Sequence, residues 1–259
     1  EDVPIVRMLE QRLGVPVFAD NNAQAAALSA QWFDGKGYDG GAVYLYIGEG
    51  IGGAYVDDRG LLRGVHNVAG YFGHMTVEPD GPRCMCGNRG CLVTLASDIA
   101  FIRGIWPDKV KSAADLTFTE RESLVKEGIE KARHGDMMAA RSLAAVTRYI
   151  GIGVANIIAA FDPHVVHIYG TMTDIATDHV VDLIRREAMQ RIWPEARGVE
   201  IKALVDYEEF LLRGATGLVL SQPYKELREQ VHEVSAAHGG SQPPAPQWLR
   251  LNEEVMNLG

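Results

Sequence analysis

The sequence has no cysteine outside positions 84–91, no long run of lysine and arginine, and no continuous apolar stretch of membrane-spanning length. Three clustered cysteines do not make a disulfide framework, and they suit a protein of the reducing cytoplasm. The formal net charge of −9 argues against binding nucleic acid through the surface of this chain. We therefore expect a cytoplasmic protein that does not enter the membrane.

The chain does have enough residues for one large domain or two modest lobes, at 259 with 47% hydrophobic side chains. Hydrophobic periodicity and turn residues predict strands that alternate with helices, which indicates an α/β fold. The expected elements, in chain order, are helix 5–13, strand 15–20, helix 21–33, hairpin 40–60, helix 135–161, strand 164–170, helix 178–193, strand 199–205 and helix 213–234.

Cys84, Cys86 and Cys91 form a C-x-C-G-x-x-G-C pattern, and His74 lies ten residues upstream of it. The two glycines permit the tight turns that would point three thiolates at one position. A set of three cysteines and one histidine is a closed tetrahedral set, typical of structural zinc. The alternatives are three reduced cysteines that happen to be neighbours, or a redox pair. We favour structural zinc.

These motifs, "AGYFGHM" followed by "CMCGNRGC", resemble the signature of the ROK family (repressors, open reading frames and sugar kinases). "VPVFADNNAQAAAL", "LYIGEGIGGAYV", "IGIGVANIIAAFDPHVVHIYG" and "RGATGLVL" resemble further family segments in the same order. The resemblance covers about residues 4–220. It implies an actin-like ATPase (ribonuclease H-like) fold of two lobes, with a sugar cleft between them.

The resemblance also implies that an N-terminal part precedes Glu1, since family members begin with a first phosphate loop and the repressors add a winged helix-turn-helix. On this basis we expect five parts. These are 1–38, the remainder of a small lobe; 39–212, a large lobe with a zinc loop at 74–91; 213–235, a helix returning to the small lobe; 236–247, a flexible linker; and 248–259, a C-terminal helix.

The general base of the sugar kinases is altered in this sequence. The resemblance places Asn21 on the family's asparagine and Asn22 on its catalytic aspartate. An amide can hydrogen-bond a sugar hydroxyl but cannot take its proton. No catalytic residue is therefore assigned, and the resemblance leaves Asn21, Asn22 and His74 as ligand-binding candidates. The alternative is a shifted register in which Asp20 serves as the base.

Three further positions depart from the family pattern. Tyr71 and Val93 replace two glutamates that accept hydrogen bonds from the sugar, and we expect the Tyr71 ring to fill that space. Glu49 replaces the threonine of the phosphate loop, where a carboxylate would repel a polyphosphate. The other interpretation of Glu49 is that its side chain points to solvent. Together the four departures predict that phosphoryl transfer has been lost.

We therefore predict the effector-binding and oligomerisation portion of a ROK-type transcriptional regulator without kinase activity. A homodimer or higher homo-oligomer is expected, because a helix-turn-helix normally engages two half-sites. DNA would be bound only through a domain outside this chain, and the effector would be a sugar or a sugar derivative. One alternative is an ATP-dependent hexose or amino-sugar kinase that uses Asp20 as an atypical base. Another is a scaffold that senses no small molecule, with Tyr71 filling the cleft.

Overall fold

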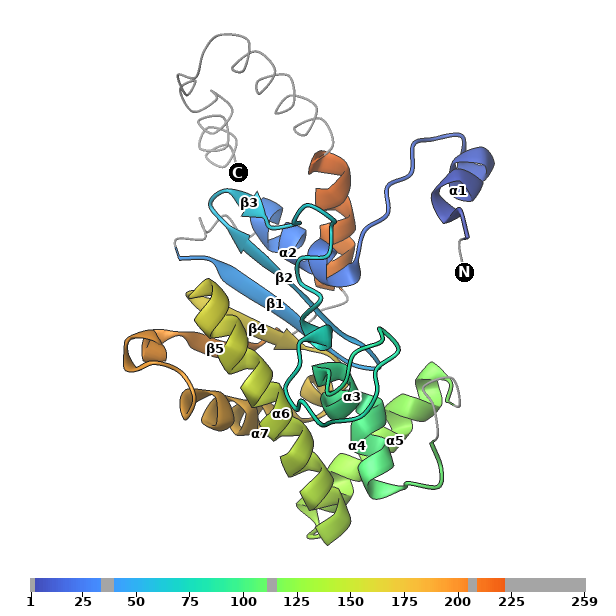
Figure 1. Cartoon of the computed structure of the whole chain (residues 1–259). Helices are drawn as coiled ribbons and strands as arrows, with labels where there is room; N and C mark the ends of the chain where they lie inside the picture. The colour runs from blue at the N-terminus through green and yellow to red at the C-terminus, as the bar shows by residue number, and fades with distance from the viewer. Residues whose placement is uncertain (1–2, 34–39, 111–115, 205–208, 222–259) are drawn as a thin grey trace. The chain divides into compact units, whose positions relative to one another are not determined.

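A computed structural model of the chain describes residues 3–33, 40–110, 116–204 and 209–221. The chain divides into two compact units, Glu1–Gly217 and Leu218–Gly259. All the named helices and strands lie in the first unit, whose centre is a five-stranded sheet in the order β3-β2-β1-β4-β5 (Figure 1). The fold is thus α/β, as the alternation of strands and helices predicted.

The expected hairpin forms one side of the sheet. β1 (Ala42–Ile47) pairs antiparallel with β2 (Ile51–Asp57), and Ile47 lies opposite Ile51 beside the glycine-rich turn. β2 pairs antiparallel with β3 (Gly60–Leu61). On its other side β1 pairs parallel with β4 (Val165–Tyr169), and β4 pairs parallel with β5 (Glu200–Ala203).

Helices bury both faces of this sheet. On β1, Val43, Leu45 and Ile47 point into the larger core, which contains residues of α3 to α7. The alternating side chains Ala42 and Tyr44 point into a second core shared with α2 and the helix 209–221. Burial on both faces explains why β1 has an almost unbroken apolar sequence. The helices and 3₁₀ turns are α1 (Ile5–Leu13), α2 (Asn22–Phe33), η1 (Phe72–His74), α3 (Leu92–Ala96), α4 (Asp98–Ile105), α5 (Phe118–Arg133), α6 (Met137–Phe161), α7 (Thr171–Met189) and η3 (Pro194–Gly198).

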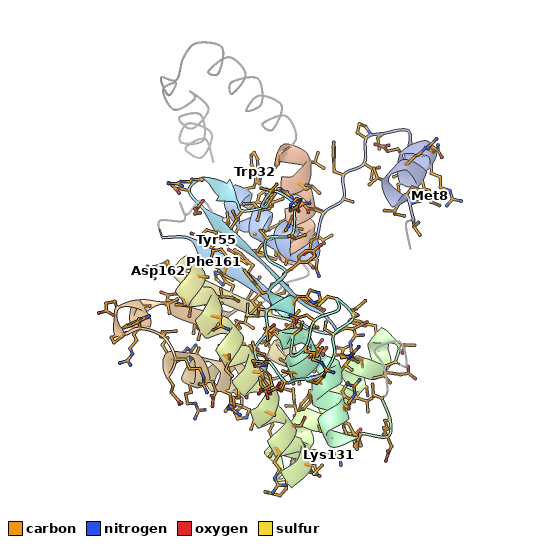
Figure 2. The ribbon with its side chains drawn as sticks, in the orientation of Figure 1. Met8, Trp32, Tyr55, Lys131, Phe161 and Asp162 are labelled. Atoms are coloured by element: carbon orange, nitrogen blue, oxygen red, sulfur yellow. The ribbon has the colours of Figure 1, made fainter. Side chains whose placement is uncertain are left out.

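Small residues let helix 209–221 approach α2 closely. A Cβ atom on Gly214 would lie 2.0 Å from the carbonyl oxygen of Ala25. A Cβ atom on Gly217 would lie 2.9 Å from the Trp32 ring, which Figure 2 labels. The two glycines of the sequence "RGATGL" therefore place this helix against α2.

The longest helix, α6, begins and ends at the residues that the sequence indicated. Asp136 caps it by accepting hydrogen bonds from the backbone N–H groups of Met138 and Ala139, and Asp162 ends it in a left-handed conformation with φ of 44°. By length and hydropathy alone α6 could cross a membrane, which the sequence analysis did not anticipate; 56% of its apolar window is buried inside the fold. The Phe161 ring near its end stacks on Tyr55 of β2 at 5.0 Å (Figure 2). The buried share of α6 is typical of a helix in the core of a folded domain.

Three sequence predictions differ from the structure. Residues 15–20 were expected to form a strand but are irregular, with Val15 and Phe18 exposed. A strand needs a hydrogen-bonded neighbour, and none of the described strands runs beside this segment. The helix expected at 178–193 begins earlier, at Thr171, with a kink at Ala176. Helices α3 and α4 were not predicted, because the cysteine loop before them gave no helical periodicity.

The predicted lobe boundaries stay predictions. The helix predicted at 213–235 is described over residues 209–221. It therefore includes residues before 213, and its predicted end lies outside the described residues. The linker predicted at 236–247 and the helix predicted at 248–259 lie outside the described residues.

Candidate functional site

His74 is held by a segment that runs along β2. The backbone N–H of Gly53 donates to the carbonyl oxygen of Gly70 at 2.7 Å. A Cβ atom on Gly70 would lie 1.9 Å from the Gly53 carbonyl oxygen, and one on Gly73 would lie 2.2 Å from that of Ile51. Only glycine permits this approach at both positions. The motif "AGYFGH" therefore fixes the His74 backbone against the start of β2.

Hydrogen bonds between backbone groups of the cysteine loop hold the loop closed. The N–H of Cys84 donates to the carbonyl oxygen of Asn88 at 2.8 Å, and that of Gly87 donates to the carbonyl oxygen of Cys84 at 3.1 Å. Gly90 has φ of 61° and passes so close to Glu78 that an added Cβ atom would overlap its carbonyl oxygen at 1.5 Å. The next residue, Cys91, directly precedes α3. The loop thus joins the four candidate ligands to a helix of the core.

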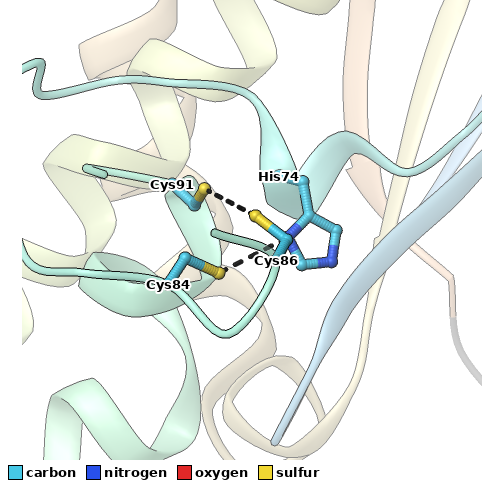
Figure 3. Close-up of side chains that lie close together, drawn as sticks. All are labelled: His74, Cys84, Cys86 and Cys91. Carbon is cyan, nitrogen blue, oxygen red and sulfur yellow. Dashed lines mark hydrogen bonds between the residues drawn. The ribbon is translucent and has the colours of Figure 1, made fainter. Parts of the chain in front are cut away.

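The structure brings His74, Cys84, Cys86 and Cys91 together, with all four ligand atoms within 4.8 Å of one another (Figure 3). The sulfur atoms of Cys86 and Cys91 lie 3.7 Å apart, and Cys84 Sγ lies 3.5 Å from His74 Nδ1. Ligand atoms of a tetrahedral zinc ion would lie about 3.5–3.8 Å apart, since Zn–S is about 2.3 Å and Zn–N about 2.0–2.1 Å. These two pairs have the separation of a tetrahedral site, and the cluster as a whole could hold a metal ion.

The thiols of the cluster differ in their electrostatic surroundings. Burial, followed by the neighbouring Cys86 and Cys84, raises the pKa of the Cys91 thiol to about 12. The backbone N–H of Asn88 is the main cause that lowers the pKa of Cys86, which is exposed. Metal binding requires thiolates, so a metal ion must displace a proton that Cys91 holds tightly. A cation able to bind soft thiolate ligands meets this requirement.

Asn21 and Asn22, the other ligand-binding candidates, lie at the start of α2. The side-chain oxygens of both asparagines accept a hydrogen bond from the backbone N–H of Ala23, at 2.9 Å for Asn21 and 2.8 Å for Asn22. Both side chains are exposed. Asn21 therefore caps α2 with its side-chain oxygen. No hydrogen bond within the described ranges joins either asparagine to His74, so a common ligand site for the three stays a prediction.

Asp20, the alternative general base, is already engaged on both oxygens. Its Oδ2 accepts from Arg63 Nη2 at 2.6 Å, and its Oδ1 accepts from the backbone N–H of Asn21 at 2.9 Å. Arg63 also donates to Gln24 Oε1 at 2.7 Å. The Asp20 side chain is only 6% exposed. Both oxygens of this carboxylate therefore already accept a hydrogen bond from the protein, one of them charge-assisted.

Tyr71 and Val93 occupy different surroundings. Tyr71 is 53% exposed and its ring lies 6.3 Å from that of His74, so the expectation that this ring fills the space of a lost glutamate stays a prediction. Val93 lies on α3, is half-buried and packs against the main core. Neither side chain can replace the carboxylate oxygens of the family pattern.

Glu49 follows neither of its two predicted behaviours in full. Its side chain is 49% exposed, yet its Oε2 lies 2.5 Å from Nη1 of Arg121, a buried residue in the first turn of α5. Arg121 Nε lies 3.6 Å from Oδ2 of Asp98, which is fully buried at the start of α4. Burial raises the pKa of Asp98 to about 6, although Thr171 and Arg121 lower it.

Sequence reasoning missed Arg63, Arg121 and Asp98. The pattern Thr117-x-x-Glu120 is a capping box that marks the start of α5, and it would have placed Arg121 in the first turn of that helix. No local pattern indicates that Arg121 points inward, because its partner Glu49 is 72 residues away along the chain. Arg63 and Asp20 are likewise 43 residues apart.

Comparisons with known proteins agree with these features. The ROK family model matches residues 1–221. The chain is 31% identical to a xylose repressor of Caldicellulosiruptor bescii over 74% of its own length and 48% of the relative's. It is 32% identical to a glucokinase of Thermotoga maritima, and this match covers 84% of the chain and 70% of the glucokinase. The chain thus spans about half the length of the xylose repressors that it matches.

A solved structure agrees with the fold. The chain superposes on a ROK family glucokinase of Streptomyces griseus, solved with glucose and AMPPNP, with a TM-score of 0.67 and 31% identity. The match covers 82% of this chain and 70% of that one. The fold is therefore the actin-like ATPase fold expected from the sequence.

Proposed function

Because this chain belongs to the ROK family, we propose that it is the effector-binding and oligomerisation portion of a transcriptional regulator without kinase activity. The observation that carries this proposal lies at the start of α2, where an amide takes the place of the carboxylate that acts as the base in the family's sugar kinases. Asn22 stands at the position of the general base, and Asp20 is held by Arg63. Phosphoryl transfer to a sugar hydroxyl needs a base that can take its proton.

The neighbouring substitutions support the same proposal. Tyr71 and Val93 provide no carboxylate for a sugar hydroxyl, and Glu49 places negative charge at the glycine-rich turn. A buried hydroxyl left without a partner costs about 1–3 kcal/mol. Binding of ATP and of a sugar in the manner of a kinase would therefore be weakened at three positions besides the base.

The metal of the His74 cluster is, on this proposal, structural zinc. Four protein ligands close a tetrahedral shell and leave no position for a reacting water molecule. His74 comes from the segment along β2, and Cys91 directly precedes α3. The ion would join these two parts of the fold without taking part in chemistry.

The protein is proposed to act in the cytoplasm as a homodimer or higher homo-oligomer. The net charge of −9 supports DNA binding through another domain rather than through this chain. The effector is proposed to be a sugar or a sugar derivative, bound by the amides of Asn21 and Asn22 and by groups near His74.

A ligand screen on the full-length protein tests the sensing role. We expect at least one member of a sugar and sugar-phosphate panel to raise the melting temperature, since a ligand that binds only the folded state stabilises it. The variant Asn22→Ala should lose this shift. The variant Gln190→Ala, which removes an exposed amide at the end of α7, should keep it. A panel without any stabilising member would contradict a sugar sensor.

A further inference from the structure

Cys91 is the member of the metal cluster that the backbone holds most firmly. It is fully buried and directly precedes α3. The backbone N–H of Leu92, the next residue, donates to the carbonyl oxygen of Met75 at 2.9 Å. An isolated β-bridge pairs Cys91 with Thr76. The backbone therefore fixes Cys91 beside the segment that follows His74.

Cys86 is the accessible member of the cluster. It is exposed, whereas Cys84 and Cys91 are buried. The Cys86 sulfur lies 3.7 Å from that of Cys91, and the two side chains point toward each other (Figure 3). The Cys84 sulfur instead lies 3.5 Å from His74 Nδ1. A small solute that reaches the cluster from solvent therefore meets Cys86, and the sulfur beside it is that of Cys91.

This pair has the arrangement of a redox-sensitive cysteine and its partner. Reactive cysteines are accessible to solvent, and a second cysteine close by converts their first oxidation product into a disulfide. All three cysteines of the chain lie within residues 84–91, so every disulfide within one molecule must form inside the cluster. Such a disulfide uses sulfur atoms that a metal ion would otherwise bind.

We propose that Cys86 and Cys91 form a disulfide when hydrogen peroxide reaches the cluster, and that this bond releases the zinc ion. The Cys86 thiolate attacks one peroxide oxygen, the O–O bond breaks, and hydroxide leaves, which gives a sulfenic acid. The Cys91 thiolate then attacks the Cys86 sulfur, and the S–O bond breaks with loss of a second hydroxide. Both hydroxides take up a proton, so two thiolates are oxidised and one peroxide is reduced to two water molecules.

The disulfide leaves His74 and Cys84 as the remaining protein ligands. Structural zinc is held by four protein ligands, so loss of two thiolates releases the ion. The His74 imidazole is then free of the metal, and His74 is one of the candidates for binding the effector. The inference rests on the zinc ion of the proposed function, and it adds a redox control to that site. A thiol reductant and zinc would reverse the change.

Oxidation of the zinc-loaded full-length protein tests the switch. Hydrogen peroxide should release one zinc ion for each disulfide formed, as a chromogenic zinc indicator measures, and dithiothreitol with added zinc should restore the bound metal. Diamide, which oxidises pairs of thiols without adding oxygen to methionine, should release zinc equally. The matched control is Met85→Leu, which removes a 99% exposed thioether next to Cys86. This variant should release zinc as the wild type does.

Trypsin digestion identifies the oxidised pair, because trypsin cuts after Arg89, between Cys86 and Cys91. The disulfide should therefore join two tryptic fragments in non-reducing mass spectrometry, and the link should persist in Cys84→Ser. If Cys84→Ser does not fold, fragmentation of the linked wild-type peptides identifies the bonded cysteine directly. Fragments that stay separate after oxidation, or a link through Cys84, would overturn the assignment of the pair.

The outcomes distinguish this inference from the proposed function. A protein that contains zinc and keeps it during oxidation by peroxide and by diamide would overturn the switch and leave the structural zinc ion in place. A protein purified without zinc would overturn the zinc assignment, and the switch with it. Zinc release that Met85→Leu abolishes would assign the sensitivity to the thioether and not to the cysteines.

Discussion

Arg63 and Arg121 lie far along the chain from Asp20 and Glu49, the carboxylates that they pair with. These two ion pairs change what the altered site can do. Asp20 already accepts a hydrogen bond on each oxygen, one of them from a guanidinium, and Glu49 pairs with a buried cation where it was predicted to repel phosphate or to point to solvent. At the residue scale, both carboxylates beside the altered site are therefore already paired with arginines of the same chain.

The cysteine cluster gives the first prediction at this scale. Replacing Cys86 by serine removes one thiolate of the proposed zinc shell, so the purified protein should contain clearly less than one equivalent of zinc and should melt at a lower temperature. Elemental analysis and thermal melting measure the two effects. Met85→Ser, at a neighbouring residue that is 99% exposed, is the matched control and should change neither. Unchanged zinc content in Cys86→Ser would refute the ligand assignment.

Asp98 gives a prediction on pH. Burial raises its pKa from 3.8 to about 6, so the folded state holds the proton more tightly than the unfolded state. This contribution to stability is complete below about pH 4 and is lost as the pH rises through about 6, for a total of about 3 kcal/mol. Asp98→Asn cannot titrate and should lack this loss.

The comparison needs denaturant unfolding of both proteins between pH 4 and pH 8. The unfolding free energy of the wild type should fall relative to that of Asp98→Asn as the pH rises across this window. Parallel curves would show that Asp98 titrates normally, and that its interactions with Arg121 and Thr171 compensate its burial.

At the scale of elements, the predictions of secondary structure were most accurate where the residues that determine an element lie within that element. The hairpin, α1 and the limits of α6 follow from periodicity, glycine turns and the Asp136 cap, all of which are local. The predicted strand 15–20 fails because a strand depends on a neighbour that local sequence does not reveal. The same reason explains the site: the cysteine spacing is local and was predicted, whereas the partners of Asp20 and Glu49 depend on tertiary packing.

The cysteine loop gives a prediction that separates backbone strain from steric overlap. Gly87 and Gly90 both have positive φ, at 94° and 61°, so alanine is strained at either position. Only at Gly90 would the added methyl group overlap another atom, the Glu78 carbonyl oxygen. Gly90→Ala should therefore cost about 1–3 kcal/mol more than Gly87→Ala. Chemical denaturation measures this difference, and equal losses would indicate that the loop can move away from Glu78.

At the scale of the whole molecule, family membership leaves two functions that share one fold. The chain is similar to xylose repressors and to glucokinases at nearly the same identity, 31% and 32%. Overall similarity therefore does not separate a regulator from a kinase, and the separation depends on a few side chains. Those side chains are Asn22, the engaged Asp20 and the charges beside the glycine-rich turn.

The most direct test is a phosphoryl-transfer assay on the full-length protein with ATP, magnesium and a panel of hexoses and amino sugars. We expect no sugar-dependent release of ADP above that of a sample without protein, for the wild type and for Asp20→Asn alike. Sugar-dependent turnover by the wild type that Asp20→Asn abolishes would instead identify the protein as a kinase with Asp20 as its base.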